Sequence, residues 1–117
     1  MSTIDDSDFL TNRTKQLAAV AELANLRTRL TDLRAELLNR MQERRQIIQR
    51  VVEQDLARQR ESGRASRTAA MQRARASEDV RSFDQSLATL RERIQRIEID
   101  VERVRLSLEV AVAGAAA

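Results

Sequence analysis

The sequence predicts an all-α protein, a long antiparallel two-helix coiled-coil hairpin, and three observations support this fold class. Apolar residues in the C-terminal half recur at spacings that alternate between four and three, a mean period of about 3.5 residues typical of a helix packed against another helix. The 117-residue chain has no Pro and two Gly, so it offers few turns. Apolar positions of the two halves oppose each other when the chain is folded back at Gly63. The stripe comprises Ala76, Val80, Phe83, Leu87, Leu90, Ile94, Ile97, Val101, Val104, Leu108 and Ala111.

The first predicted element is a polar, acidic N-terminal segment over residues 1–7, followed by a first helix over 8–61. Thr3 and Asp6 have the spacing of a helix-capping box, and acidic residues suit the positive end of a helix dipole. Adjacent apolar pairs such as Ile47-Ile48 cannot both lie on a narrow seam, because neighbours on a helix point about 100° apart. The first helix is therefore expected to have a wide apolar face, as in a helical bundle.

A basic turn is predicted over residues 62–66, where Ser62-Gly63 is the strongest turn signal in the chain. Gly63 suits the left-handed conformation that ends many helices, and Ser66 suits the cap of the next one. The second helix is expected over 67–113, with Ser77-Glu78-Asp79 as a later alternative start, and a tail of small residues over 114–117.

A turn at Gly63 pairs Leu30 with Ile97, Leu33 with Ile94, Leu37 with Leu90, and Ile47 with Val80. The alternative is one continuous helix in a parallel coiled coil, since Gly inside a helix costs only about 1 kcal/mol. The predicted helix-pairing seam consists of Leu30, Leu33, Leu37, Ile47, Val80, Phe83, Leu87, Leu90, Ile94, Ile97, Val101 and Val104.

Each helix carries a second apolar stripe, and in the hairpin both stripes lie at the end away from the turn. One hairpin buries one seam per helix, so these stripes would stay in water, and exposed contiguous apolar surface usually marks an interface. We expect a second copy to cover them, closing a dimeric four-helix bundle. The predicted oligomer or partner interface comprises Leu10, Leu17, Val20, Ile99, Leu106 and Val110.

The other end of the hairpin is basic. Residues 40–76 hold ten Arg and four acidic residues, a net charge of +6, whereas the remaining 80 residues sum to −3. Such a tip suits an acidic protein face or nucleic-acid phosphates, although it has no aromatic residue for base stacking. The predicted basic tip comprises Arg58, Arg60, Arg64, Arg67, Arg73 and Arg75.

Composition narrows the function classes. The chain has no Cys and no His, which excludes thiol chemistry and removes the commonest general base and transition-metal ligand. Its carboxylates mostly lie at ion-pair spacing from Arg, as Glu92 does from Arg96. We expect no catalytic, cofactor-binding or metal-binding residues, no small-molecule substrate and no enzyme activity.

No stretch approaches the ~18 apolar residues of a membrane span, and the acidic N-terminus is unlike a secretory signal. These features predict a cytoplasmic protein without a signal peptide or transmembrane segment. We expect a structural or adaptor protein that associates with itself and with another protein in a larger assembly. The alternative is a nucleic-acid-binding module that uses the Arg-rich tip.

Overall fold

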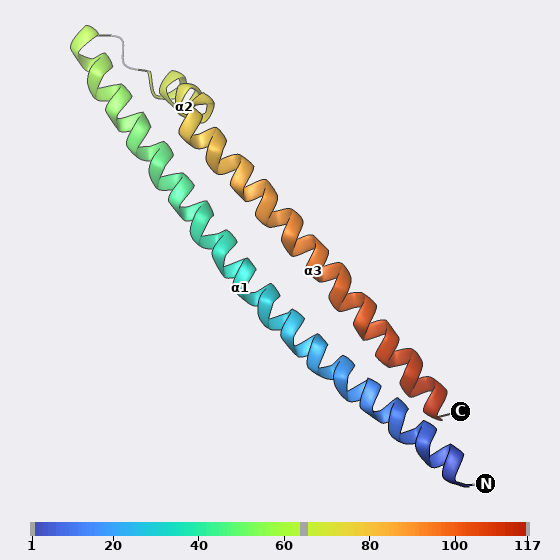
Figure 1. Ribbon diagram of the computed structural model, residues 1–117. Coiled ribbons are helices and arrows are strands. Elements are labelled where there is room, and N and C mark those ends of the chain that lie inside the picture. Colours follow the sequence, from blue (N-terminus) through green and yellow to red (C-terminus); the bar gives the residue numbers. More distant parts are fainter. Residues whose placement is uncertain (1, 64–65, 117) are drawn as a thin grey trace. The chain divides into compact units, whose positions relative to one another are not determined.

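The computed structural model describes residues 2–63 and 66–116, and these residues form three α-helices and no strand (Figure 1). Helix α1 spans Ser2–Ser62, α2 spans Arg67–Ala76 and α3 spans Glu78–Ala116. The all-helical fold class is therefore confirmed. None of the helices in the described part of the chain is long and apolar enough to cross a lipid bilayer.

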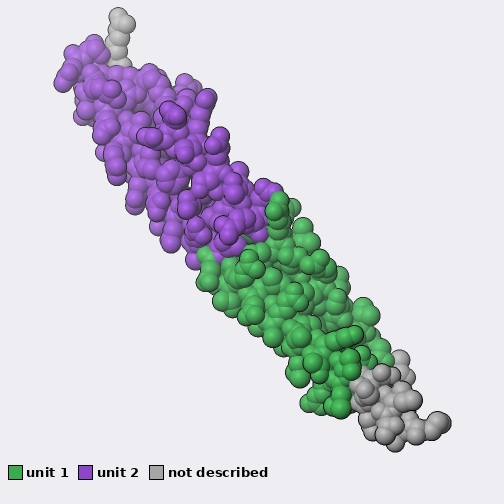
Figure 2. Space-filling view, viewed as in Figure 1, with its two compact units in different colours: residues 1–32, 94–117 green, residues 33–93 purple. Residues whose placement is uncertain are grey.

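The chain divides into two compact units, and both contain parts of α1 and α3 (Figure 2). Unit 1 comprises residues 1–32 and 94–117, so it combines the first half of α1 with the second half of α3. Unit 2 comprises residues 33–93 and contains the rest of both helices, the turn and α2. Each unit thus brings together segments that are far apart in the sequence, as a hairpin requires.

The turn in unit 2 is built as the sequence predicts. Gly63 has φ +70, the left-handed conformation that glycine adopts without steric cost, and its N–H donates to the carbonyl of Arg60 at 3.3 Å. Ser66 is extended, and its hydroxyl accepts from the N–H of Ala69 at 3.4 Å, which caps α2. The backbone N–H of Ser66 also donates to the side chain of Gln59, which links the turn back to α1.

The predicted second helix is not continuous, because Ser77 divides it into α2 and α3. Ser77 has extended backbone angles (φ −63, ψ 150), and its hydroxyl both donates to the Ala74 carbonyl at 2.6 Å and accepts from the Val80 N–H at 3.4 Å. The Ser77 side chain therefore caps both the C-terminus of α2 and the N-terminus of α3. The alternative start at Ser77-Glu78-Asp79 marks the beginning of α3, whose first turn holds both acids.

The outer boundaries of the predicted helices also need correction. Helix α1 begins at Ser2 and includes the segment over 1–7 that the sequence predicts to precede it, except for Met1, which lies outside the described residues. At the other end α3 continues to Ala116, beyond the predicted end at residue 113. Both extensions follow from composition, because the acids of the first segment suit a helix N-terminus and Ala is the best helix former.

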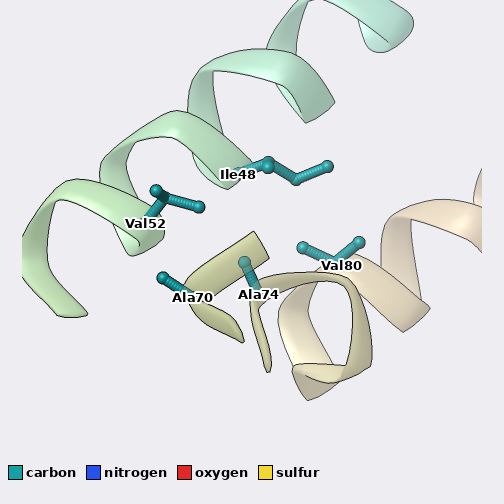
Figure 3. Packing of buried hydrophobic residues seen from close by; sticks show 5 residues of the cluster. All are labelled: Ile48, Val52, Ala70, Ala74 and Val80. Carbon is teal, nitrogen blue, oxygen red and sulfur yellow. The ribbon is translucent and has the colours of Figure 1, made fainter. Parts of the chain in front are cut away.

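In unit 2 a small apolar core joins all three helices (Figure 3). Ile48 and Val52 of α1 meet Ala70 and Ala74 of α2 and Val80 of α3, and none of these side chains is more than 8% exposed. The alanines lie four residues apart on one face of α2. Because their side chains are small, α2 can lie close to α1.

Two polar contacts between α1 and α3 in unit 2 show that these helix segments run antiparallel. The Arg44 Nε donates to the Asp84 carboxylate at 2.6 Å, and an Arg40 guanidinium N–H donates to the Ser86 hydroxyl at 2.8 Å. Both pairs lie within one residue of the partners expected for a turn at Gly63. Contacts between residues 40 or more positions apart rule out the continuous helix of the alternative within unit 2.

The predicted seam is largely buried. Eight of its twelve residues are buried, while Leu37, Ile47, Phe83 and Val101 are half-buried. Ala76, the first residue of the stripe, is exposed because the break at Ser77 gives α2 its own orientation, and Ala74 is buried instead. The buried seam residues of unit 1 are Leu30, Ile94, Ile97 and Val104, and those of unit 2 are Leu33, Val80, Leu87 and Leu90.

Candidate interaction surfaces

The first candidate is an apolar surface on unit 1, formed by the six residues predicted as an interface. Their side chains are 48–72% exposed, and all of them lie in unit 1. One stripe is on α1 and the other is on α3. We call this set the unit 1 apolar surface: Leu10, Leu17, Val20, Ile99, Leu106 and Val110.

Between these two helices, unit 1 has an open groove of about 850 Å³. Phe9 and Ala19 of α1 and Leu108, Ala111 and Gly114 of α3 line it together with polar residues. Small residues on α3 leave space here that larger side chains would fill. Phe9 itself is 62% exposed and extends the exposed apolar area of unit 1, although the sequence did not place it in the interface.

Charged side chains border the α3 stripe. Arg105 forms ion pairs with Glu102 one turn before it and with Glu109 one turn after it, the latter at 3.0 Å. The hydrogen bond from Arg105, helped by its charge, lowers the pKa of the Glu102 carboxyl and raises the pKa of Arg105. Both side chains lie on the solvent-exposed surface, so their effect on stability is small. An apolar strip bordered by ion pairs is the pattern of an interface with a polar rim.

The second candidate is the basic tip in unit 2, and its arginines differ in their surroundings. Arg73 is held by Asp55, with 2.7 Å between its Nε and the carboxylate, and Asp55 is also bound by Gln59. Arg73 is therefore part of the structure that ties α2 to α1, and its charge is neutralised. Arg64 lies outside the described residues, and the other predicted members, Arg58, Arg60, Arg67 and Arg75, are exposed.

Beside the tip, unit 2 has a groove of about 520 Å³ between α1 and α2. Its sides carry four arginines, and three apolar side chains lie at its base. We call it the arginine groove, lined by Arg44, Arg45, Arg67 and Arg75 together with Ile48, Val52, Met71 and Gln49.

The sequence placed Arg67 and Arg75 in the basic tip but missed that Arg44 and Arg45 would join them. The signal was the spacing of Arg45, Ile48 and Val52, which puts one arginine on the same face of α1 as two core residues. Only the position of α2, set by its buried alanines, turns this face into a groove.

Comparisons with models of protein families, with curated proteins and with solved structures found no match to this chain. Among residues 2–63 and 66–116, no cluster of three or more carboxylates has the arrangement needed to hold a metal ion.

Proposed function

We propose that this chain is a non-enzymatic structural or adaptor protein that associates with a second copy through the unit 1 apolar surface. The observation that carries the proposal is the exposure of all six predicted interface residues, from 48% for Leu106 to 72% for Val110, within a single unit. Two exposed stripes on two helices of one unit match the faces that a dimeric four-helix bundle buries.

A stable interface typically removes about 800 Å² of accessible surface from each partner. A two-fold contact is the simplest solution, because it covers the same surface on both copies at once.

Light scattering coupled to size exclusion tests this proposal on the full chain. We expect a dimer or a larger oligomer at micromolar concentration, and monomers after the double substitution Leu17→Glu and Leu106→Glu. Both residues are exposed, so helicity by circular dichroism should change little.

Leu38→Glu is the matched control, because Leu38 is 65% exposed but belongs to unit 2. This variant should remain as large as the unmodified protein. A monomeric unmodified chain, or equal dissociation by both variants, would refute the proposal.

A second candidate function is nucleic-acid binding by the basic tip. Arg58, Arg60, Arg67 and Arg75 are exposed, which supports contact with phosphates. The only aromatic residue in unit 2 is Phe83, which belongs to the seam, so the tip has no aromatic side chain on which a base could stack. Anisotropy of labelled single-stranded and duplex oligonucleotides at 50 and 200 mM salt tests this candidate, which predicts binding that weakens steeply with salt.

A further inference from the structure

We propose that the arginine groove of unit 2 is a docking site for an acidic amphipathic helix of a partner protein. The site lies between α1 and α2 within one unit. It shares no residue with the unit 1 apolar surface, so this inference does not depend on self-association.

The first argument is charge. Arg45, Arg67 and Arg75 are exposed, and none of them forms an ion pair with another described residue. Arg44 differs, because Asp84 holds it at 2.6 Å and fixes it at one side of the groove. No acidic residue lines the groove. Residues 33–93 carry 14 Arg against nine acids, so the surrounding unit adds a positive field rather than cancelling it.

The second argument is the apolar base of the groove. Ile48 and Val52 belong to the buried core and are at most 8% exposed, so Met71, which packs against that core and is half-buried, offers most of the apolar surface that a ligand can reach. Methionine is flexible and adapts to partners of different shape. A ligand that contacts both the arginines and the apolar residues of the groove must present carboxylates beside apolar side chains. One face of an acidic amphipathic helix does so.

The same base argues against nucleic acid as the occupant. Phosphates and sugars gain little from aliphatic side chains, and the groove has no aromatic residue on which a base could stack. Carboxylates suit arginine as well as phosphates do, because both accept two parallel hydrogen bonds from one guanidinium.

Fluorescence anisotropy with a designed probe tests the proposal on the full chain. The probe is a labelled 15-residue peptide with Leu at positions 1, 4, 8, 11 and 15, Glu at the positions that flank this stripe and Ala elsewhere, and its helicity is checked by circular dichroism. We expect saturable binding that weakens at least tenfold when the five Leu are replaced by Ala, since charge and helix propensity are then kept but most of the apolar contact is lost. Equal binding of both peptides would show attraction by charge alone and would overturn the proposal.

Two charge-matched variants locate the site. Arg67→Glu with Arg75→Glu changes two groove residues, whereas Arg58→Glu with Arg60→Glu changes the same charge on exposed arginines that do not line the groove. We expect at least a tenfold loss of affinity for the first and less than a twofold loss for the second, with unaltered helicity in both.

Equal losses in the two charge-matched variants would overturn the proposal. So would tighter binding of a labelled 20-nucleotide single strand or duplex than of the peptide, if that binding is lost in the groove variant. Stronger self-association that depends on Arg67 and Arg75 would identify a second copy as the occupant and would also overturn it.

Discussion

The two glycines of the chain differ in backbone conformation. Gly63 has a positive φ of 70, and Gly114 lies inside α3 with no positive φ. A Cβ at either position would have no steric contact within 4 Å with more distant parts of the chain, so only the backbone conformation distinguishes them. The left-handed conformation costs a residue with a Cβ about 1–2 kcal/mol, whereas Ala inside a helix is favoured over Gly by up to about 1 kcal/mol.

Alanine substitutions at the two glycines should therefore change stability in opposite directions. We expect Gly63→Ala to lower the free energy of unfolding by about 1 kcal/mol and Gly114→Ala to raise it slightly. Urea unfolding followed by circular dichroism at constant protein concentration measures both. Stabilisation by Gly63→Ala would contradict the left-handed turn.

The ion pair on the α3 rim gives a prediction about ionisation. Arg105 lowers the pKa of Glu102, so Arg105→Ala should raise that pKa towards its ordinary value. Because the folded-state pKa is lowered, the ion pair stabilises the folded state at neutral pH, and this contribution is lost as the pH falls through that pKa. An NMR titration of the Glu102 side-chain carboxyl carbon checks the shift, and an unchanged pKa in the variant would disprove the role of Arg105.

At the scale of elements, α2 shows why part of the fold could not be predicted. Sequence periodicity is carried by large apolar residues, but the buried face of α2 consists of Ala70 and Ala74. Alanine is common on exposed helix surfaces too, so these two positions gave no signal. The sequence offers Ser77 only as an alternative helix start, because a serine cap in the middle of a good helical sequence competes with continuation of the helix.

Leucine substitutions in α2 test whether its small residues determine the packing. Ala74 is fully buried and Ala76 is exposed, and both lie in the last turn of α2. We expect Ala74→Leu to destabilise the protein by about 1–3 kcal/mol through overpacking, and Ala76→Leu to change stability by less than about 0.5 kcal/mol. Chemical denaturation of the two variants provides the comparison, and similar values would mean that α2 does not pack through Ala74.

At the scale of the whole molecule, the sequence predicted the location of apolar residues better than the location of charges. Most residues with a strict 3.5-residue period are buried or half-buried, with Ala76 as the exception, and the off-seam apolar residues Leu17 and Leu106 are exposed. Periodicity reports which face of a helix a residue occupies, and burial follows from the face. The formation of the arginine groove depends instead on how closely α2 approaches α1. Whether Arg73 is available to a partner depends on a single acid, Asp55, which reaches it from α1.

Self-association also predicts how thermal stability depends on protein concentration. If the unit 1 apolar surface is buried only in the dimer, each tenfold rise in concentration favours the folded dimer by about 1.4 kcal/mol, so the melting temperature should rise by several degrees. The Leu17→Glu and Leu106→Glu variant should melt at one temperature at all concentrations, because its folded state is a monomer. The Leu38→Glu variant should keep the concentration dependence, since its substitution lies in unit 2. Scanning calorimetry between about 5 and 500 µM separates these outcomes, and a concentration-independent melting temperature for the unmodified chain would exclude coupling between folding and self-association.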